Sequence, residues 1–408
     1  MMAKKIKIKI KISGIKITNG KYMLTIGSVL SLFVFGLFDS LKGSTISALL
    51  GEIGFSYSLG GVIVMGQYAG YFAATFLAGR MLDCFGHKMT LVFAGICMLA
   101  GVMGYAASSA ILLLLLSIFL IGMGLGTLEL SGSNIITVYY PEKKGRYLNI
   151  LTAVAGIGAI LSPMAVSALF GEGFSWRMVY YSGVLVLFPV TFYFILIKSP
   201  AASRNEQTGN FTKKSVAERA LTPLFRNDFL TMYIANFLYM AAEMGIATWI
   251  AEFYAAGTSG FAENSAKCLS LFYIGMTLGR IIGSIFVDRL GRRSSILFAS
   301  AAASACILAG IFGPSALSIC VAVSGAFCSI IFPTATAVIS GFPEGDSGRI
   351  QGFYFACGGL GGMFGPWIMG IVSDCCGIKW GMVLGSVFLA AISGLCFRIS
   401  EQNHCHTF

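Results

Sequence analysis

Charged residues are scarce in this chain. Asp, Glu, Lys and Arg account for 11% of its 408 residues, and 56% are hydrophobic. A soluble domain carries about 25% charged residues, so this sequence has too few to cover the surface of a soluble protein of its length. Apolar runs of ~18 residues or more recur along the chain instead. We therefore predict an all-α membrane protein that crosses the bilayer many times.

Several motifs of catalytic proteins are also missing. The sequence has no Walker nucleotide-binding motif and no His-Glu-x-x-His or other zinc spacing. It has only three histidines, one in a loop and two near the C-terminus, and its 11 cysteines are scattered without a paired spacing. We therefore expect no enzymatic activity, no cofactor and no metal site.

Hydropathy predicts twelve membrane-spanning helices separated by charged or Gly/Pro-rich breaks. The only long polar connection is 199–227, which divides the helices six and six. The predicted spans are 22–50, 57–82, 89–107, 110–139, 147–170, 177–198, 228–254, 264–288, 294–312, 315–342, 350–373 and 379–398.

Lys and Arg predict the orientation, because basic residues concentrate on the cytoplasmic side of a membrane. The formal net charge of +11 comes mostly from the N-terminal segment and from loops on one side. We predict cytoplasmic tails at 1–21 and 399–408, a cytoplasmic linker at 199–227, and six-helix bundles at 22–198 and 228–398. The expected location is the cell inner (plasma) membrane.

The two halves of the sequence repeat. PEKKGR (141–146) recurs as PEGDSGR (343–349), and GRMLDCFGHK (79–88) has a counterpart in SIFVDRLGRR (284–293). The offset between copies is close to 204 residues in both cases. Two parallel repeats of six helices are an architecture of transporters that bind substrate between the repeats near the bilayer midplane.

The segment Gly79-x-x-x-Asp83-x-x-Gly86-x-Lys88 resembles the loop signature of the major facilitator superfamily. Its second copy is weaker, with Ser284 in place of the first glycine. Within that superfamily, GLGTLELSGSNIITVYYPE (124–142) and AAEMGIATWIAEFY (241–254) are similar to the fucose:proton symporter family. The resemblance implies the major facilitator fold, with two pseudo-symmetric bundles that enclose a central cavity.

The loop signature suggests residues that control opening of one end of the bundles. Glycine near a helix end permits close approach of another helix, and an aspartate can pair with a basic group or with helix N-terminal amides. The alternative is a turn that fixes topology without any gating. A third match at Gly370, Asp374, Gly377 and Lys379 falls on the predicted outer side, and we assign it no gating role. The predicted gating residues are Gly79, Asp83, Gly86, Lys88, Asp288, Gly291 and Arg292.

Three carboxylates lie deep within predicted spans: Asp39, Glu129 and Glu243. Asp39 and Glu243 are 204 positions apart and so fall at equivalent points of the two repeats. Desolvation favours the protonated form of a carboxyl group, which allows proton exchange near neutral pH. We predict all three as proton-coupling candidates, with Glu129 first because the fucose-symporter resemblance matches it, and Asp39 as the likelier substrate contact.

Two structural alternatives remain for these carboxylates. Lys42 lies three residues after Asp39 on the same helical face, so the two can form a buried ion pair that only holds the bundle together. Glu243 can pair in the same way with Arg280, the other deep cation.

Polar and aromatic side chains near the carboxylates are candidates for recognising a sugar, which needs hydrogen bonds and ring stacking. Aromatic residues in membrane helices also pack or lie at the interface. The predicted substrate-binding residues are Asp39, Gln67, Asn134, Asn236, Trp249, Gln351 and Tyr354.

The sequence thus predicts a secondary active transporter that moves a small polar, sugar-like solute by alternating access, with proton-coupled symport. The alternative is a proton-driven exporter of amphipathic compounds or drugs. We expect a small-molecule substrate, protons and membrane lipid as partners, no nucleic acid, and a monomer.

Overall fold

The computed structural model describes residues 2–197, 227–256, 265–339 and 347–403. The side chains of residues 1–19 and of a few helical positions are not described. Most of the predicted linker (199–227), the last five residues, and the side chains of Gln351 and Asp288 therefore lie outside the described residues.

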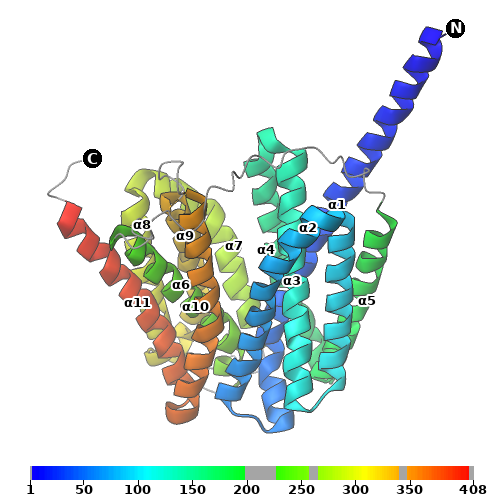
Figure 1. Ribbon diagram of the computed structural model, residues 1–408. Helices are drawn as coiled ribbons and strands as arrows, with labels where there is room; N and C mark the ends of the chain where they lie inside the picture. Colours follow the sequence, from blue (N-terminus) through cyan, green and yellow to red (C-terminus); the bar gives the residue numbers. More distant parts are fainter. Residues whose placement is uncertain (1, 198–226, 257–264, 340–346, 404–408) are drawn as a thin grey trace, which may run out of the picture. The chain divides into compact units, whose positions relative to one another are not determined.

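All regular structure in the described part of the chain is helical (Figure 1). Two short 3-10 helices, η1 (Pro141–Lys143) and η4 (Ser315–Ile319), adjoin longer helices. The α-helices are α1 (Met2–Ile53), α2 (Tyr57–Ala107), α3 (Ile111–Tyr139), α4 (Lys144–Gly171), α5 (Trp176–Leu196), α6 (Asn227–Ala255), α7 (Ser265–Leu290), α8 (Arg292–Phe312), α9 (Cys320–Ile339), α10 (Ser347–Cys376) and α11 (Ile378–Asn403).

These helices agree with the predicted spans. Ten described segments are long and apolar enough to cross a membrane, and α2, at 51 residues, is one of them. At 1.5 Å per residue its helical turns add up to about 75 Å, which is enough for two crossings of a ~30 Å hydrocarbon core. α7 is not among the ten, although it lies where a span was predicted. The fold class is therefore confirmed as an all-α membrane protein.

Gly86 divides α2 into the two predicted spans. Its backbone has φ 74° and ψ 175°, which interrupts the helix between the second and third spans. Gly291, its counterpart in the second repeat, has φ 80° and ψ 151° and precedes α8. Only glycine adopts these positive φ values without strain, so both copies of the loop signature make the same turn.

Contacts divide the chain into two compact units. The first consists of Met1–Gly36, Gly70–Gly158 and Tyr180–Ala220, and the second of Leu37–Ala69, Ala159–Val179 and Leu221–Phe408. These boundaries cut through α1 and α2. The predicted bundle boundaries at 22–198 and 228–398 therefore stay a prediction.

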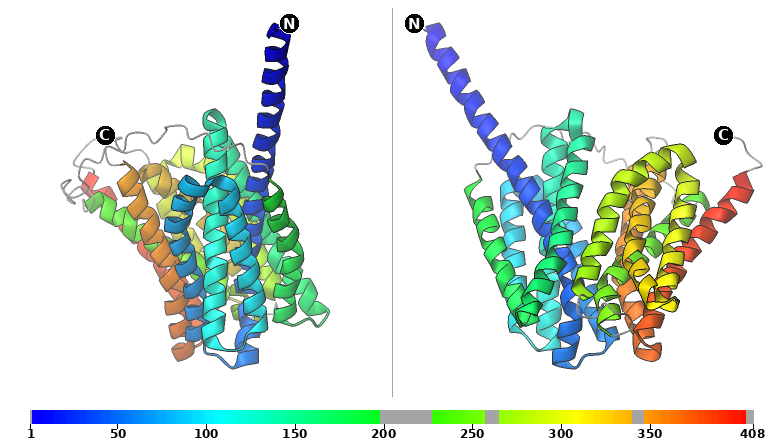
Figure 2. Two further views of the ribbon diagram at one scale, coloured as in Figure 1. Left: turned by 45° about the vertical axis from the view of Figure 1, so that its right-hand side comes forward. Right: turned by 180° about the vertical axis from the view of Figure 1, so that it is seen from behind.

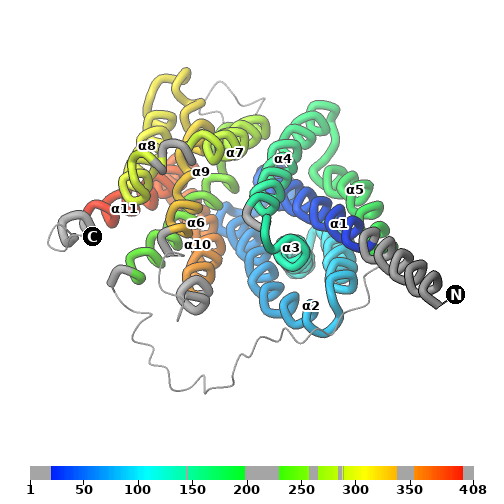
Figure 3. The backbone as a smooth tube through the Cα atoms, turned by 90° about the horizontal axis from the view of Figure 1, so that it is seen from above, coloured from blue at the N-terminus to red at the C-terminus, as the bar shows by residue number. Residues whose placement is uncertain are grey.

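In the first unit, α1, α3 and α4 share a core. Leu32, Ile136 and Leu151 form a buried cluster, one residue from each helix. Glycines bring the backbones close: a Cβ at Gly36 would lie 1.8 Å from the Ala155 carbonyl oxygen, and one at Gly70 would lie 2.0 Å from that of Phe119. Figure 3 shows α3 beside α1, α2 and α4, so the helix that carries Glu129 packs against several helices of this unit.

In the second unit, α6 packs against α10 and α11, while α9 packs against α7 and α8 (Figures 1 and 2). Glycines of α10 permit the closest approach. A Cβ at Gly361 would lie 2.1 Å from the Phe237 carbonyl oxygen, and one at Gly365 would lie 2.3 Å from that of Ala241. The Gly-rich run 358–362 of α10 is thus a close-packing segment.

Candidate functional site

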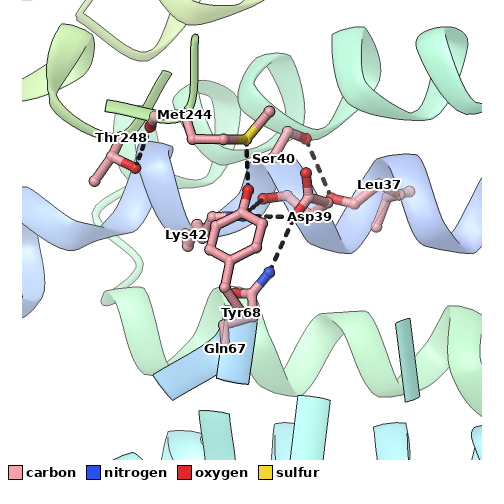
Figure 4. A network of polar contacts seen from close by, with 8 residues as sticks. All are labelled: Leu37, Asp39, Ser40, Lys42, Gln67, Tyr68, Met244 and Thr248. Carbon is pink, nitrogen blue, oxygen red and sulfur yellow. Dashed lines mark hydrogen bonds and ion pairs between the residues drawn. The ribbon is translucent and has the colours of Figure 1, made fainter. Parts of the chain in front are cut away.

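Asp39 is at the centre of a polar network in the membrane-spanning part of α1, Gly20–Ile53 (Figure 4). Its Oδ1 atom accepts hydrogen bonds from Lys42 Nζ at 2.5 Å and from Gln67 Nε2 of α2 at 3.0 Å. Tyr68, next to Gln67, donates its hydroxyl proton to the sulfur of Met244 on α6. The network therefore links α1, α2 and α6 through side chains that would be costly to place in lipid.

Lys42 is held on three sides. Besides the carboxylate, Nζ donates to the Asp39 carbonyl oxygen at 2.8 Å and lies 5.0 Å from the centre of the Tyr68 ring. The side chains of Lys42 and Asp39 are 9% and 20% exposed. Gly43 brings this part of α1 against α6, since a Cβ there would lie 2.3 Å from the Ala247 carbonyl oxygen. Lys42 and Asp39 therefore form an ion pair in which Lys42 is buried and Asp39 is partly exposed, and its purely structural role stays a prediction.

The ion pair predicts an unequal effect of single and double substitutions. Asp39→Asn leaves the Lys42 ammonium without a counter-charge, which costs about 3–5 kcal/mol for a buried pair. Asp39→Asn combined with Lys42→Met removes both charges, so we expect the double variant to recover most of that loss. Thermal unfolding of the purified protein measures both. Equal stability of the two variants would show that Lys42 does not depend on Asp39.

Glu243 lies on α6 and is 7% exposed. The charge of Arg280, on α7, acts on it, but no ion pair within 4.0 Å joins these two described residues. Tyr239, one helical turn earlier on α6, is a hydrogen-bond partner of Glu243, and Asp39 is a further charged group near it. The predicted Glu243–Arg280 ion pair is therefore not formed, although the two charges are near enough to influence each other.

Glu129 lies on α3 in the first unit, and one of its carboxylate oxygens accepts a hydrogen bond from the Tyr71 hydroxyl of α2. The Tyr71 ring also contacts the Phe35 ring of α1, with centroids 6.5 Å apart. Glu129 is partly exposed, so groups other than Tyr71 can also reach its carboxylate. A carboxyl group with a phenol as hydrogen-bond donor can take up and release a proton without leaving this position.

The predicted substrate-binding residues differ in exposure. Gln67 belongs to the Asp39 network, and Asn134 of α3 is partly exposed. Asn236, Trp249 and Tyr354 are buried: Asn236 donates to the Tyr354 carbonyl oxygen at 2.8 Å, and Trp249 Nε1 donates to that of Pro366 at 2.9 Å. Their binding roles stay predictions.

The predicted gating residues lie around the two equivalent turns. Asp83 and Arg292 are exposed, Lys88 is partly exposed, and Arg292 donates to the Ala337 carbonyl oxygen at 3.3 Å. A Cβ at Gly79 would meet no atom within 4 Å, so the close helix approach expected there is not part of this conformation. Their gating role also stays a prediction.

The sequence interpretation missed a contact at the other end of α2, which we call the α2–α10 contact (Tyr57, Ser58 and Gly61 with Trp367, Gly370 and Asp374). Asp374 accepts hydrogen bonds from the backbone N–H groups of Tyr57 at 2.7 Å and Ser58 at 2.8 Å. It thereby satisfies amides at the first turn of α2 that have no partner within the helix. Asp374 belongs to the third copy of the loop signature, to which no role was assigned.

Close glycine contacts and an aromatic pair lie in the same region as the α2–α10 contact. A Cβ at Gly61 would lie 2.5 Å from the Trp367 Cα, and one at Gly370 would lie 2.5 Å from the Tyr57 carbonyl oxygen. The Tyr57 hydroxyl donates to Glu252 of α6 at 2.9 Å, and its ring packs edge-to-face on Trp249 at 5.6 Å. α2 is thus fixed against α6 and α10 by contacts between residues up to 317 positions apart.

Known proteins support the same fold. A relative described as a TsgA homolog from Yersinia pseudotuberculosis is 22% identical over 346 residues, covering 83% of this chain and 86% of the relative. The crystal structure of a D-xylose–proton symporter matches with a TM-score of 0.76 at 14% identity, over 92% of this chain and 97% of the symporter. FucP, in an outward conformation, matches with a TM-score of 0.61 at 20% identity, over 93% of this chain and 99% of FucP.

The sequence pattern of one family extends over nearly all of the membrane-spanning region. It matches residues 28–267 and again 232–404. The helices, the two equivalent turns at Gly86 and Gly291, and the similarity to FucP agree with the resemblance seen in the sequence. The chain is a multi-pass membrane transporter and belongs to the Major Facilitator Superfamily.

Proposed function

We propose that this protein is a secondary active transporter that moves a small polar, sugar-like solute by alternating access and couples that movement to protons as symport. The observation that carries the proposal is Glu129, a carboxylate in the middle of an apolar helix that is bonded to the Tyr71 hydroxyl. Ionisable groups at such depth are expensive and mark substrate or proton pathways in transporters.

The Asp39 network supports a polar substrate. Both protein hydrogen bonds to the Asp39 carboxylate end on Oδ1, and no described residue donates to Oδ2. Lys42 is bound to Asp39 by two hydrogen bonds, which makes it a poor counter-ion for an anionic substrate. A solute with hydroxyl groups fits acceptor oxygens of this kind.

We place the protein in the cell inner (plasma) membrane. The basic residues of its loops support an orientation in which both termini are cytoplasmic. In that orientation the turns at Gly86 and Gly291 face the cytoplasm, and the α2–α10 contact faces outward. The contact then closes the outer end of the helices in one state of the transport cycle and must part in the other.

Uptake into energised vesicles tests this function. We expect a neutral polyhydroxylated solute from a panel of sugars, organic acids and amphipathic drugs to accumulate against its gradient, and an uncoupler of the proton gradient to prevent accumulation. Vesicles without the protein serve as the control. Proton-dependent extrusion of amphipathic compounds, without accumulation of any sugar, would support the exporter in place of the symporter.

A further inference from the structure

An open cleft lies beside the α2–α10 contact, within the second unit. Its volume is about 320 Å³, which is in the range of pockets that hold small molecules. The wall comes from α1, the turn between α1 and α2, and the ends of α2, α6 and α10 that meet there. The polar side chains that line it are Ser47, Ser56, Tyr57, Glu252 and Asp374. None of them belongs to the predicted substrate-binding residues, so the cleft is a separate candidate site.

The cleft carries negative charge. Glu252 and Asp374 line it, and no basic side chain does. Neither carboxylate takes part in an ion pair with another described residue. A cleft with one sign of charge on its walls focuses the field and raises the local concentration of solutes of the opposite sign. The charge therefore favours a cation as the occupant.

The Asp374 carboxylate is already well supplied with donors. Its two oxygens accept hydrogen bonds from the backbone N–H groups of Tyr57 and Ser58. The hydroxyls of Ser56 and Ser58 also bond to it. Asp374 therefore contributes its charge to the cleft and few open acceptor positions.

The Glu252 carboxylate is only half used. Its Oε1 accepts the hydrogen bond from the Tyr57 hydroxyl at 2.9 Å, whereas no described residue donates to Oε2. The Oγ atom of Ser47 is buried and has no hydrogen-bond partner in the described part of the chain. Buried polar groups in folded proteins are nearly always bonded. Two acceptors, Glu252 Oε2 and Ser47 Oγ, are thus without a donor in residues that line the cleft.

We propose that this cleft binds a small organic cation that carries a primary ammonium group. The ammonium donates a hydrogen bond to Glu252 Oε2, and Asp374 supplies a second negative charge. An ammonium group has three donors and no acceptor, which suits a lining whose open groups accept. Hydrogen bonds between two charged groups are also about twice as strong as neutral ones. An anion would meet two like charges in the same place.

The bound cation would also act on transport, a consequence that rests on the proposed alternating access. Tyr57 of α2 and Asp374 of α10 both line the cleft and are joined by a hydrogen bond, so the cleft is complete only while the α2–α10 contact is formed. A ligand that binds one conformation shifts the population toward it. The cation is therefore a regulator that holds this contact closed, and not the transported solute.

Isothermal titration calorimetry on the purified full-length protein tests the site without any transported substrate, so the result is independent of the proposed function. The probe is ethanolamine, which is protonated at neutral pH, and ethylene glycol is its neutral counterpart of similar size. We expect ethanolamine alone to bind, and Glu252→Gln to raise its Kd about tenfold or more, the effect of losing a hydrogen bond between charged groups. Glu172→Gln is the matched control, because Glu172 is exposed at the end of α4 and does not line the cleft.

Glutamine keeps an oxygen that accepts the Tyr57 hydrogen bond, and thermal unfolding without ligand checks that Glu252→Gln is folded. Gly61→Leu provides a second measurement, because it separates α2 from α10 and leaves every lining residue in place. We expect its Kd for ethanolamine to rise as well. The proposal fails if the wild type does not bind ethanolamine, if ethylene glycol binds equally well, or if Glu252→Gln binds ethanolamine like the wild type. Wild-type affinity in Gly61→Leu would overturn the link to the α2–α10 contact.

Discussion

Replacement of Glu129 by glutamine is expected to abolish accumulation of the substrate while exchange across the membrane continues. Glutamine has nearly the same shape and its Oε1 can still accept the hydrogen bond from the Tyr71 hydroxyl, so the local structure is kept. It cannot take up or release a proton. A carrier that no longer binds the coupling ion equilibrates its substrate but cannot concentrate it, because the two binding events are no longer linked.

Two assays on reconstituted vesicles separate these activities. Gradient-driven uptake should fall to the level of vesicles treated with an uncoupler, whereas counterflow of labelled substrate should remain near the wild-type rate. Glu142→Gln is the matched control, because Glu142 is exposed in η1, next to the end of α3. Persistent accumulation by Glu129→Gln would assign the proton to another carboxyl group, with Asp39 and Glu243 the next to be substituted.

The turns were predictable because they depend on local chemistry. Gly86 and Gly291 occupy equivalent places in a repeat that can be read directly from the sequence, and both adopt the positive φ that glycine alone tolerates easily. The Asp39–Lys42 ion pair was predictable for a similar reason, since residues three apart on one helix are neighbours. In each case the residues that interact are close together in the sequence.

Contacts between distant residues were not predictable in this way. Asp374 lies in a segment that matches the loop signature, yet its partners are the amides of Tyr57 and Ser58, more than 300 residues earlier. Nothing in the spacing of α10 indicates which helix its carboxylate meets. Every residue except proline has a backbone N–H group, so the pattern of side chains cannot show which amides Asp374 binds.

The sequence also could not show that the aromatic and amide candidates for substrate binding are buried. Asn236, Trp249 and Tyr354 are polar or aromatic residues in membrane helices, which is typical both of binding residues and of packed ones. The structure places their side chains at 2%, 0% and 0% exposure and gives Asn236 and Trp249 backbone carbonyls as partners. Which face of α6 and α10 is inside depends on the neighbouring helices, and helical periodicity is weak when nearly every position is apolar.

Gly61→Leu should reduce transport strongly, because it prevents the α2–α10 contact from forming. A Cβ at this position would lie 2.5 Å from the Trp367 Cα and 3.0 Å from the Pro366 carbonyl oxygen. Both are backbone atoms of α10, which cannot rotate away as a side chain would. Overpacking of this kind costs about 1–3 kcal/mol, and a bias of that size shifts a two-state equilibrium by roughly 5- to 150-fold.

Under the alternating access proposed above, the contact forms and parts in every cycle, so we expect counterflow exchange to fall by a similar factor in Gly61→Leu. Gly394→Leu on α11 is the control, since a Cβ there would meet no atom within 4 Å and the same leucine is added. Both variants are compared at equal amounts of monodisperse protein in vesicles, which separates a transport defect from a folding defect. Wild-type exchange by Gly61→Leu would mean that α2 and α10 need not approach this closely, and that the outer end closes through other residues.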